Sequence, residues 1–386
     1  MARIVIAPDS FKGTIAAADV AAALAEGWSS ARPDDEIMLR PMADGGEGTL
    51  EAFAGAFPDA VRVPVRVTGP TGFAVDAAWL RLPPTDEAPG GVGVVELAST
   101  SGIELLGDAR RPWEASTIGF GQAIAAALAA GVSQLVLGIG SSASTDGGTG
   151  LLTALGARFV DAFETSIAPG ASGLDDVARV DLSALKALPV NGVQVLCDVT
   201  NPLLGGSGAA AVFGPQKGLD PDGVARADAG LARLVGVLKG LEGDSLPVEM
   251  ARMADPESPG AGAAGGAGYG LLAWGAEIVP GAVRVADLTG LQEAIAGADV
   301  VITGEGSYDG QSAAGKAPAH VAQLADAAGA RVAVVAGRIA ADTSDLAHAV
   351  SLTELAGSSQ AAIAEPAVHL RAAGAALAGV LLPEAR

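Results

Sequence analysis

Short apolar runs near the N-terminus alternate with a longer segment whose apolar residues recur at helical spacing. The runs Arg3–Ala7 and Glu36–Arg40 are predicted to be strands, with a helix between them from about Thr14 to Ser30. Strands that alternate with helices are typical of a mostly parallel sheet. This end of the chain therefore predicts an α/β fold.

The same pattern returns near the C-terminus. Strands are predicted at Asp299–Thr303, Arg331–Ala336 and Ala347–Leu352, a loop and helix at Lys316–Gly329, and a last helix at about Pro366–Leu381. We expect both chain ends to contribute to one α/β domain.

The middle of the chain follows a different pattern. Residues 61–98 read as short strands with turns, residues 115–160 return to helix, strand, loop and helix, and residues 254–270 are rich in Pro, Gly and Ala. A chain of 386 residues is too long for one ordinary domain and suits two. We predict a Rossmann-like, mostly parallel α/β domain from residues 1–60 and 286–386, and an inserted α/β domain from residues 61–285.

Charge narrows the classes of partner. The formal net charge is −21 and the sequence pI is about 4.4, so the chain would repel nucleic acid and anionic membranes. The same charge would repel anionic substrates, so a phosphate site needs positive side chains close to the phosphate. The chain has only 23 Lys and Arg residues, which makes a lysine inside a Gly-rich loop informative. The single cysteine, Cys197, excludes an internal disulfide.

Residues 115–145 carry no charge and could be mistaken for a membrane span. Gly131, Ser133 and Gln134 interrupt the run, and a helix followed by a strand explains it better. The N-terminal apolar run is too short for a signal peptide. We therefore expect a cytoplasmic protein.

Three segments combine carboxylates with glycines. Ala43–Thr49 contains Asp44 and Glu47, and the pattern recurs at Asp146-Gly147-Gly148 and at Gly304-Glu305-Gly306, with Asp309 nearby. Glycine allows tight turns and close approach to a ligand. Carboxylates there can hold a divalent cation or accept a proton from a hydroxyl. A single Asp-Gly pair is also an ordinary turn, but three such loops predict one site for phosphate and metal.

The loop after the first strand carries Asp9, Ser10 and Lys12. Ligands of open α/β sheets bind beyond the carboxyl ends of the strands, and the following helix start favours anions. Lys12 could neutralise a phosphate, while Asp9 and Ser10 could contact metal or substrate. The alternative is helix capping by Ser10 or Thr14 beside a solvated lysine.

Two further lysines lie in loops. Lys217 is predicted in a turn, and Lys316 at a helix start after a Gly-rich stretch that begins at Gly310. That stretch nearly matches a P-loop, but Ala317 replaces the hydroxyl residue that would bind Mg²⁺, so we reject a P-loop. Asp198 follows an apolar strand and is a candidate metal ligand or general base, or the start of an Asx turn.

The segment Gly138–Ala143 matches the G-x-G-x-x-A dinucleotide fingerprint, and Asp161 follows at a fitting distance. An NAD(P)-linked oxidoreductase is therefore an alternative. Its hydroxyls, Ser141 and Ser142, suit a phosphate or carboxylate equally well. Residues 260–265 also fit the glycine pattern, but no strand precedes them, and we interpret them as a flexible loop near a site.

The three histidines of the chain are not spaced as metal ligands or as members of a catalytic triad. His320, His348 and His369 show no metal-ligand spacing, so a zinc site or a Ser-His-Asp triad is not expected. Carboxylates, lysines, hydroxyls and glycine amides remain, and they match phosphoryl transfer with Mg²⁺.

These motifs occur in a specific order along nearly the whole chain. They are residues 7–12, 43–49, 138–143, 146–148, 197–203, 213–218, 259–266 and 303–306, followed by Asp309, Gln311 and Gly315-Lys316. In this order they resemble the bacterial glycerate kinase family, the type without a P-loop. The chain departs from the family pattern at Gly140-Ser141-Ser142, at Thr145 (commonly Asn) and at Ser307 (commonly Arg).

The resemblance implies ATP- and Mg²⁺-dependent phosphorylation of D-glycerate, usually at the 2-hydroxyl, in a cleft between two α/β domains. We predict Lys12, Asp44 and Asp198 as catalytic residues, with both aspartates as Mg²⁺ candidates. Substrate- or phosphate-binding residues are predicted at Asp9, Ser10, Gly45, Gly46, Glu47, Ser141, Ser142, Asp146, Lys217, Glu305, Asp309, Gln311 and Lys316. A non-catalytic nucleotide-binding protein is a further alternative, and a homodimer is compatible with the sequence.

Overall fold

The computed structural model describes residues 1–309 and 317–382, a mixed α/β structure with mostly parallel sheets, as predicted. The predicted residues Gln311 and Lys316 lie outside the described residues. The chain divides into two compact units. Unit 1 comprises Met1–Asp44, Glu51–Pro58 and Ala282–Arg386, and unit 2 comprises Gly45–Leu50 and Asp59–Gly281.

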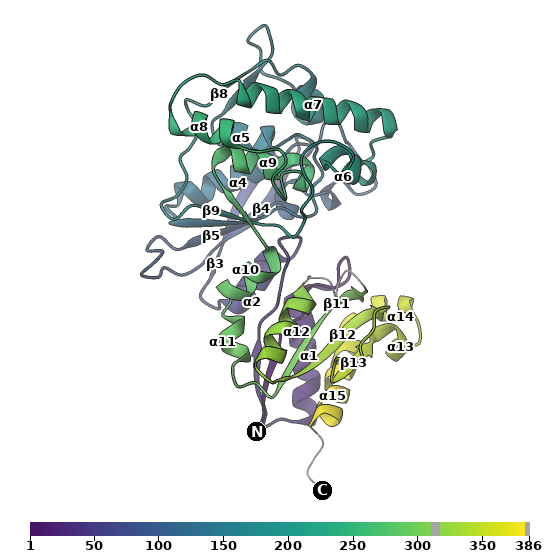
Figure 1. Cartoon of the computed structure of the whole chain (residues 1–386). Helices are drawn as coiled ribbons and strands as arrows, with labels where there is room; N and C mark the ends of the chain where they lie inside the picture. The colour runs from purple at the N-terminus through teal and green to yellow at the C-terminus, as the bar shows by residue number, and fades with distance from the viewer. Residues whose placement is uncertain (310–316, 383–386) are drawn as a thin grey trace. The chain divides into compact units, whose positions relative to one another are not determined.

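Unit 1 contains a five-stranded parallel sheet in the order β13-β12-β11-β1-β2. Purple N-terminal strands and yellow-green C-terminal strands lie side by side in it (Figure 1). Ile4 aligns with Ile37 on one side and with Val300 on the other. The strands are β1 (Arg3–Ile6), β2 (Glu36–Leu39), β11 (Val300–Tyr308), β12 (Arg331–Ile339) and β13 (His348–Ser351).

Helices α1 and α15 of unit 1 pack tightly on each other, because glycines remove the side chains between them. A Cβ on Gly27 would lie 2.0 Å from the carbonyl oxygen of Arg371, and one on Gly374 would lie 2.3 Å from that of Leu24. The helices of this part are α1 (Ala17–Ala31), α2 (Thr49–Ala56), α10 (Gly281–Leu288), α11 (Leu291–Ile295), α12 (Ala317–Ala327), α13 (Leu352–Ala356), α14 (Ser359–Ala364) and α15 (Pro366–Leu381).

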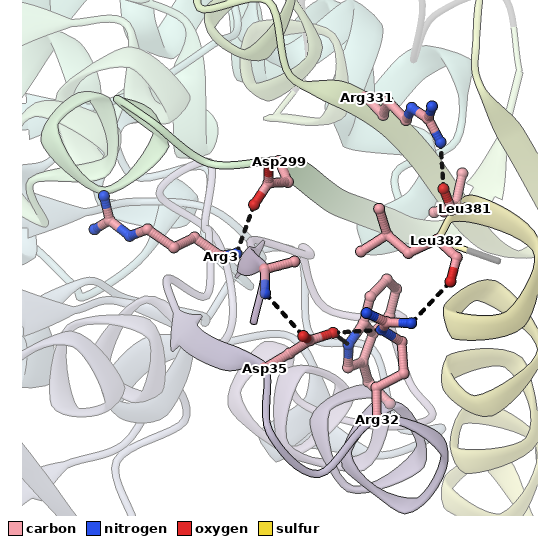
Figure 2. Close-up of polar contacts among 9 residues, drawn as sticks. Arg3, Arg32, Asp35, Asp299, Arg331, Leu381 and Leu382 are labelled. Carbon is pink, nitrogen blue, oxygen red and sulfur yellow. Dashed lines mark hydrogen bonds and ion pairs between the residues drawn. The ribbon is translucent and has the colours of Figure 1, made fainter. Parts of the chain in front are cut away.

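Charged contacts gather at the amino ends of these strands (Figure 2). Asp35, just before β2, accepts hydrogen bonds from the Ala2 amide, the Trp28 indole and Arg32 Nε at 2.8, 3.1 and 2.6 Å. Arg32 also donates to the carbonyl oxygen of Leu382, beyond α15. This network ties the C-terminal end of α15 to the sheet and lies at the edge opposite the strands' carboxyl ends.

Unit 2 contains a six-stranded sheet in the order β10-β9-β6-β5-β4-β3. The first four strands are parallel, and β3 and β4 form an antiparallel hairpin at one edge. The strands are β3 (Val61–Thr68), β4 (Ala74–Arg81), β5 (Val92–Glu96), β6 (Gln134–Gly138), β9 (Val193–Leu196) and β10 (Glu277–Val279). A separate antiparallel pair consists of β7 (Arg158–Val160) and β8 (Arg179–Asp181).

The helices of unit 2 pack with this sheet around one large apolar core. They are α3 (Ala98–Ser101), α4 (Ile118–Ala129), α5 (Thr149–Ala154), α6 (Ala209–Lys217), α7 (Pro221–Lys239), α8 (Leu246–Met253) and α9 (Ala263–Trp274), with 3-10 turns at Glu104–Leu106 and Ala171–Asp175. The uncharged run forms α4 and then β6, as expected. Within the described residues, no helix combines the length and hydropathy needed to cross a membrane.

One sequence prediction about loops is wrong. Strand β11 continues to Tyr308, so Gly304-Glu305-Gly306 lies within a strand and not in a loop. Glu305 aligns with Ala336 on β12, which is also longer than expected. Each strand satisfies the other's backbone groups, and this mutual pairing outweighs the turn preference of the two glycines.

Candidate functional site

The segment Gly45–Leu50 of unit 2 lies against the carboxyl ends of β6 and β9. The Gly140 amide, just after β6, donates to the Gly45 carbonyl at 2.9 Å. A Cβ on Gly45 would lie 2.3 Å from the carbonyl oxygen of Leu196, the last residue of β9, and the φ of Gly45 is +93°. Only glycine fits this close, left-handed position. The strand-end loops predicted separately thus meet at one edge of the sheet.

A buried glutamate fixes this segment from the end of β5. Glu96 is 4% exposed, and its Oε2 accepts hydrogen bonds from the amides of Gly48 at 3.1 Å and Leu50 at 3.2 Å. These amides belong to the N-terminal turn of α2, where amides lack helical partners and a negative charge is favoured. The sequence analysis missed Glu96. The sequence feature that could have identified Glu96 is its position as a carboxylate at the end of an apolar run, which forms the buried strand Val92–Glu96.

Asp146 is fully buried and receives its hydrogen bonds from the chain itself. Its Oδ2 accepts from the Thr117 amide at 2.8 Å and hydroxyl at 2.9 Å, and from Ser116 Oγ and the Gly150 amide at 3.3 Å. Its Oδ1 accepts from the Gly148 amide at 3.1 Å. The carboxylate therefore holds the loop between β6 and α5 against the start of α4.

Lys217, the last residue of α6, is also buried, with 2% of its surface exposed. Its Nζ donates to Ser142 Oγ at 2.8 Å and to the Ser144 carbonyl oxygen. Burial lowers the pKa of Lys217 to about 7, although the nearby Asp146 charge acts to raise it. The structure thus brings together three predicted phosphate-binding residues, Ser142, Asp146 and Lys217, inside unit 2.

The Gly-rich segment at the start of α9 packs against Lys217. Ala264, Gly265 and Gly266 have φ values of +54°, +67° and +88°. A Cβ on Gly265 would lie 2.9 Å from Lys217 Nζ, and the Gly265 carbonyl accepts a hydrogen bond from the Gly147 amide at 3.0 Å. This segment, predicted as a flexible loop, is packed against the β6–α5 loop.

The dinucleotide interpretation of Gly138–Ala143 is wrong. Such a fingerprint requires a strand, a helix and a second parallel strand in the same sheet. Here the chain passes from β6 through α5 to β7, and β7 pairs antiparallel with β8 outside the main sheet. Asp161 follows that separate strand. Ser141 instead adopts a left-handed φ of +58°, and its carbonyl accepts from the Ile103 amide at 2.8 Å.

Asp198 is exposed two residues beyond β9. Its Oδ1 accepts a hydrogen bond from the Gly281 amide at 2.7 Å, at the first residue of α10. Residues 1–309 and 317–382 contain no group of three or more His, Cys, Asp or Glu side chains placed to hold a metal ion.

In unit 1, the predicted residues of two motifs lie side by side. The Asp9 amide donates to the Gly304 carbonyl at 2.8 Å, and the Cβ position of Gly306 lies 3.5 Å from Phe11 Cα. Lys12 is exposed, Glu305 is buried, and Asp9, Ser10 and Asp309 are partly exposed. The strands before Lys12 and Asp44 are neighbours, because β1 pairs in parallel with β2.

Comparison with known proteins places this arrangement in a family. A family model described as the glycerate kinase family matches residues 4–382. The chain belongs to the glycerate kinase family. It is 39% identical to the glycerate 2-kinase of Escherichia coli K12 over 344 residues, which cover 88% of this chain and 86% of that protein. It is also 39% identical to the glycerate kinase of Halalkalibacterium halodurans over 342 residues, with the same coverages.

A solved structure supports the relation. A protein assigned as a glycerate kinase 2 from Salmonella typhimurium LT2 matches with a TM-score of 0.81 and 38% identity. The match covers 98% of both chains. The family resemblance inferred from the motifs is therefore confirmed, and the chain is a kinase by family.

Proposed function

We propose that this protein transfers the γ-phosphoryl group of ATP to D-glycerate, with the 2-hydroxyl as acceptor. The main support is the match to the glycerate kinase family over residues 4–382, together with 39% identity to a protein named glycerate 2-kinase. Three of the motifs that predicted the family, residues 7–12, 43–49 and 138–143, follow the carboxyl ends of β1, β2 and β6. This is where α/β proteins bind ligands.

Phosphate charge requires a local cation in a chain of net charge −21. Lys12 is exposed on the loop after β1, beside the Gly304–Gly306 part of β11. Lys12 therefore neutralises charge that develops on the transferred phosphoryl group, and Asp9 and Ser10 orient the phosphates. Lys217 is enclosed in unit 2, so its role is argued separately below.

The exposed carboxylates Asp44 and Asp198 are the candidates for the metal and the general base. Mg²⁺ is commonly held by one or two carboxylates with water and substrate phosphates, so the donor set fits without a third protein ligand. When bound, Mg²⁺ neutralises phosphate charge. One of the two aspartates holds the ion, and the other accepts the proton of the attacking hydroxyl. Glu47 and the Gly45 and Gly46 backbone contribute further substrate contacts.

The remaining assignments follow the same proposal. ATP and D-glycerate are the substrates, and the cytoplasm is the site of the reaction because ATP is available there. Ser141, which is partly exposed on the β6–α5 loop, contributes a hydroxyl to substrate or phosphate binding. Asp309, Gln311 and Lys316 complete the phosphate contacts. A homodimer stays a prediction.

The experiment is an ADP-release assay with ATP, in the presence and absence of D-glycerate and Mg²⁺. Turnover should require both additions, and ³¹P NMR of the product should show 2-phosphoglycerate. Formation of 3-phosphoglycerate would overturn the choice of hydroxyl. ATP binding without turnover would favour the non-catalytic alternative.

The carboxylate roles have their own test. Asp198→Asn should lower turnover by roughly 10²-fold, in line with the loss of a general base or metal ligand. The partly exposed Asp228 on α7 supplies a matched control, because its Oδ1 likewise accepts a hydrogen bond from a backbone amide, that of Gly205, and Asp228→Asn should retain wild-type turnover. Equal turnover in both variants would exclude Asp198 from the reaction.

A further inference from the structure

Lys217 is one of only five lysines in the chain, with Lys12, Lys186, Lys239 and Lys316. Lysine is almost never fully buried unless it is paired, yet Lys217 is 2% exposed at the end of α6. Its two hydrogen-bond acceptors, Ser142 Oγ and the Ser144 carbonyl, both belong to the loop that joins β6 to α5. The amine therefore links a helix end to one loop far away in sequence.

The space around the amine is closed on its other side. The left-handed segment Ala264–Gly266 packs against it, and a Cβ on Gly265 would lie 2.0 Å from the Ser144 carbonyl oxygen. Left-handed conformations at a non-glycine residue such as Ala264 persist only where the surrounding structure imposes them. The Lys217 amine, the β6–α5 loop and Ala264–Gly266 are thus in direct contact with one another.

The hydrogen bonds fit a neutral amine. A neutral amine has two N–H donors, which equals the two acceptors, whereas an ammonium has three. Asp146, on the same loop, is the charged group that acts on Lys217, and five donors from the chain already satisfy it. Ala264–Gly266 carries no charge, and the rest of α6 contains no other ionisable residue.

Two buried hydroxyl groups lie next to these contacts in the sequence. Ser144 Oγ and Thr145 Oγ1 have no hydrogen-bond partner within residues 1–309 and 317–382. The third N–H of a protonated amine has no acceptor in this arrangement, and these hydroxyls could accept it only after the loop moves, so protonation favours a rearranged loop. Burial supports a change of charge near neutral pH, because it lowers the pKa of Lys217 to about 7.

We propose that Lys217 is a positioning residue, whose neutral amine holds the β6–α5 loop in its active shape and whose protonation loosens that loop. The same loop carries the partly exposed Ser141, and its Gly140 amide donates a hydrogen bond to the Gly45 carbonyl. Lys217 therefore acts on the site through the loop and does not touch substrate. The effect on turnover rests on the proposed kinase function, whereas the protonation state does not.

Lysine NMR tests the protonation state directly. With ¹³Cε-labelled lysine, the wild type gives at most five signals, and the Lys217→Met variant identifies the one from Lys217. That signal should titrate near pH 7, about three pH units below an ordinary lysine. If all signals titrate near pH 10, the neutral amine is excluded, whatever the enzyme does.

The pH profile of turnover tests the positioning role. Lys217→Met removes both N–H donors, and Lys217→Gln keeps two N–H donors that cannot titrate near neutral pH. Wild-type kcat should fall roughly 10-fold from pH 8 to pH 6, as one essential group becomes protonated. Lys217→Met should lose roughly 10-fold or more in kcat at pH 8 with a smaller change in KM, because the loop acts in the transition state.

Lys217→Gln should recover several-fold in kcat over Lys217→Met and should lack the fall between pH 8 and pH 6. The exposed Lys239→Met is the matched control and should keep the wild-type profile. Wild-type kcat in Lys217→Met, or a wild-type pH profile in Lys217→Gln, would overturn the proposal. If Lys217→Met does not fold, Lys217→Gln and the wild-type titration still decide it. A wild type without glycerate-dependent turnover would refute the kinase function alone.

Discussion

Replacing Glu96 tests whether one buried carboxylate holds the Gly45–Leu50 segment in place. Glu96→Gln keeps the size of the side chain but removes the charge that faces the Gly48 and Leu50 amides. Hydrogen bonds to a charged group contribute about 1.5–3 kcal/mol each, and a neutral amide oxygen retains part of that. The helix N-terminus adds about 0.3–1 kcal/mol for a negative charge. We expect Glu96→Gln to lower the free energy of unfolding by about 1–3 kcal/mol.

Turnover should fall further than stability alone explains. A displacement of about 1 Å in a positioned group can cost about 10²-fold in rate, and the segment carries Glu47 and two glycines of the proposed site. The assay pairs urea unfolding with glycerate-dependent ADP release at a temperature where the variant is folded. Glu104→Gln, at an exposed position, is the control. A Glu96→Gln protein within about 0.5 kcal/mol of wild type and with full turnover would refute this reasoning.

Three further outcomes follow from the charges described above. Lys12→Ala should lower turnover roughly 10²-fold even at saturating ATP, as measured by initial rates, whereas full turnover would remove Lys12 from catalysis. The folded-state pKa of Lys217 lies below its unfolded value, so the unfolded chain binds more protons between about pH 7 and 10. Wild-type unfolding free energy should therefore rise by about 2 kcal/mol from pH 7 to 9 relative to Lys217→Met, and a flat difference in urea unfolding would contradict this. For Asp35, burial alone would raise the pKa, but hydrogen bonds from Arg32, Ala2 and Trp28 and the Arg32 charge lower it overall, so its contribution is lost as pH falls below about 4. The stability gap between wild type and Asp35→Asn should be smaller at pH 3 than at pH 7, and a constant gap in thermal unfolding would contradict this.

The sequence predicted those helices and strands that are specified by the residues within them. The last helix was predicted at Pro366–Leu381 and is observed there, because proline favours a first helical position and the apolar residues keep helical spacing. The parallel strands at both chain ends were also recognised from short apolar runs. Asp9 and Lys12 were placed in the loop after the first strand for the same reason.

Long-range pairing explains what the sequence did not predict. Gly304–Gly306 has the composition of a turn, but its extended form depends on a partner strand that comes later in the chain. Lys217 reads as a turn residue, and its burial depends on Ser142–Ser144 and Gly265, which are distant in sequence. The role of Glu96 could not be recognised from a sequence motif, because its hydrogen-bond partners are backbone amides, which every residue type except proline can supply. Each of these features requires knowledge of which segments meet.

The pairing of β1 with both β2 and β11 has a consequence for synthesis on the ribosome. Strand β2 emerges soon after β1, but β11 and the helix α15 that covers α1 emerge only after the whole of unit 2. Domains generally fold as units while the chain is being made. Unit 2 can therefore complete its core first, while the apolar N-terminal strand and the glycine face of α1 wait for partners made last. This interval exposes the nascent chain to aggregation and is the stage at which a chaperone has most to protect.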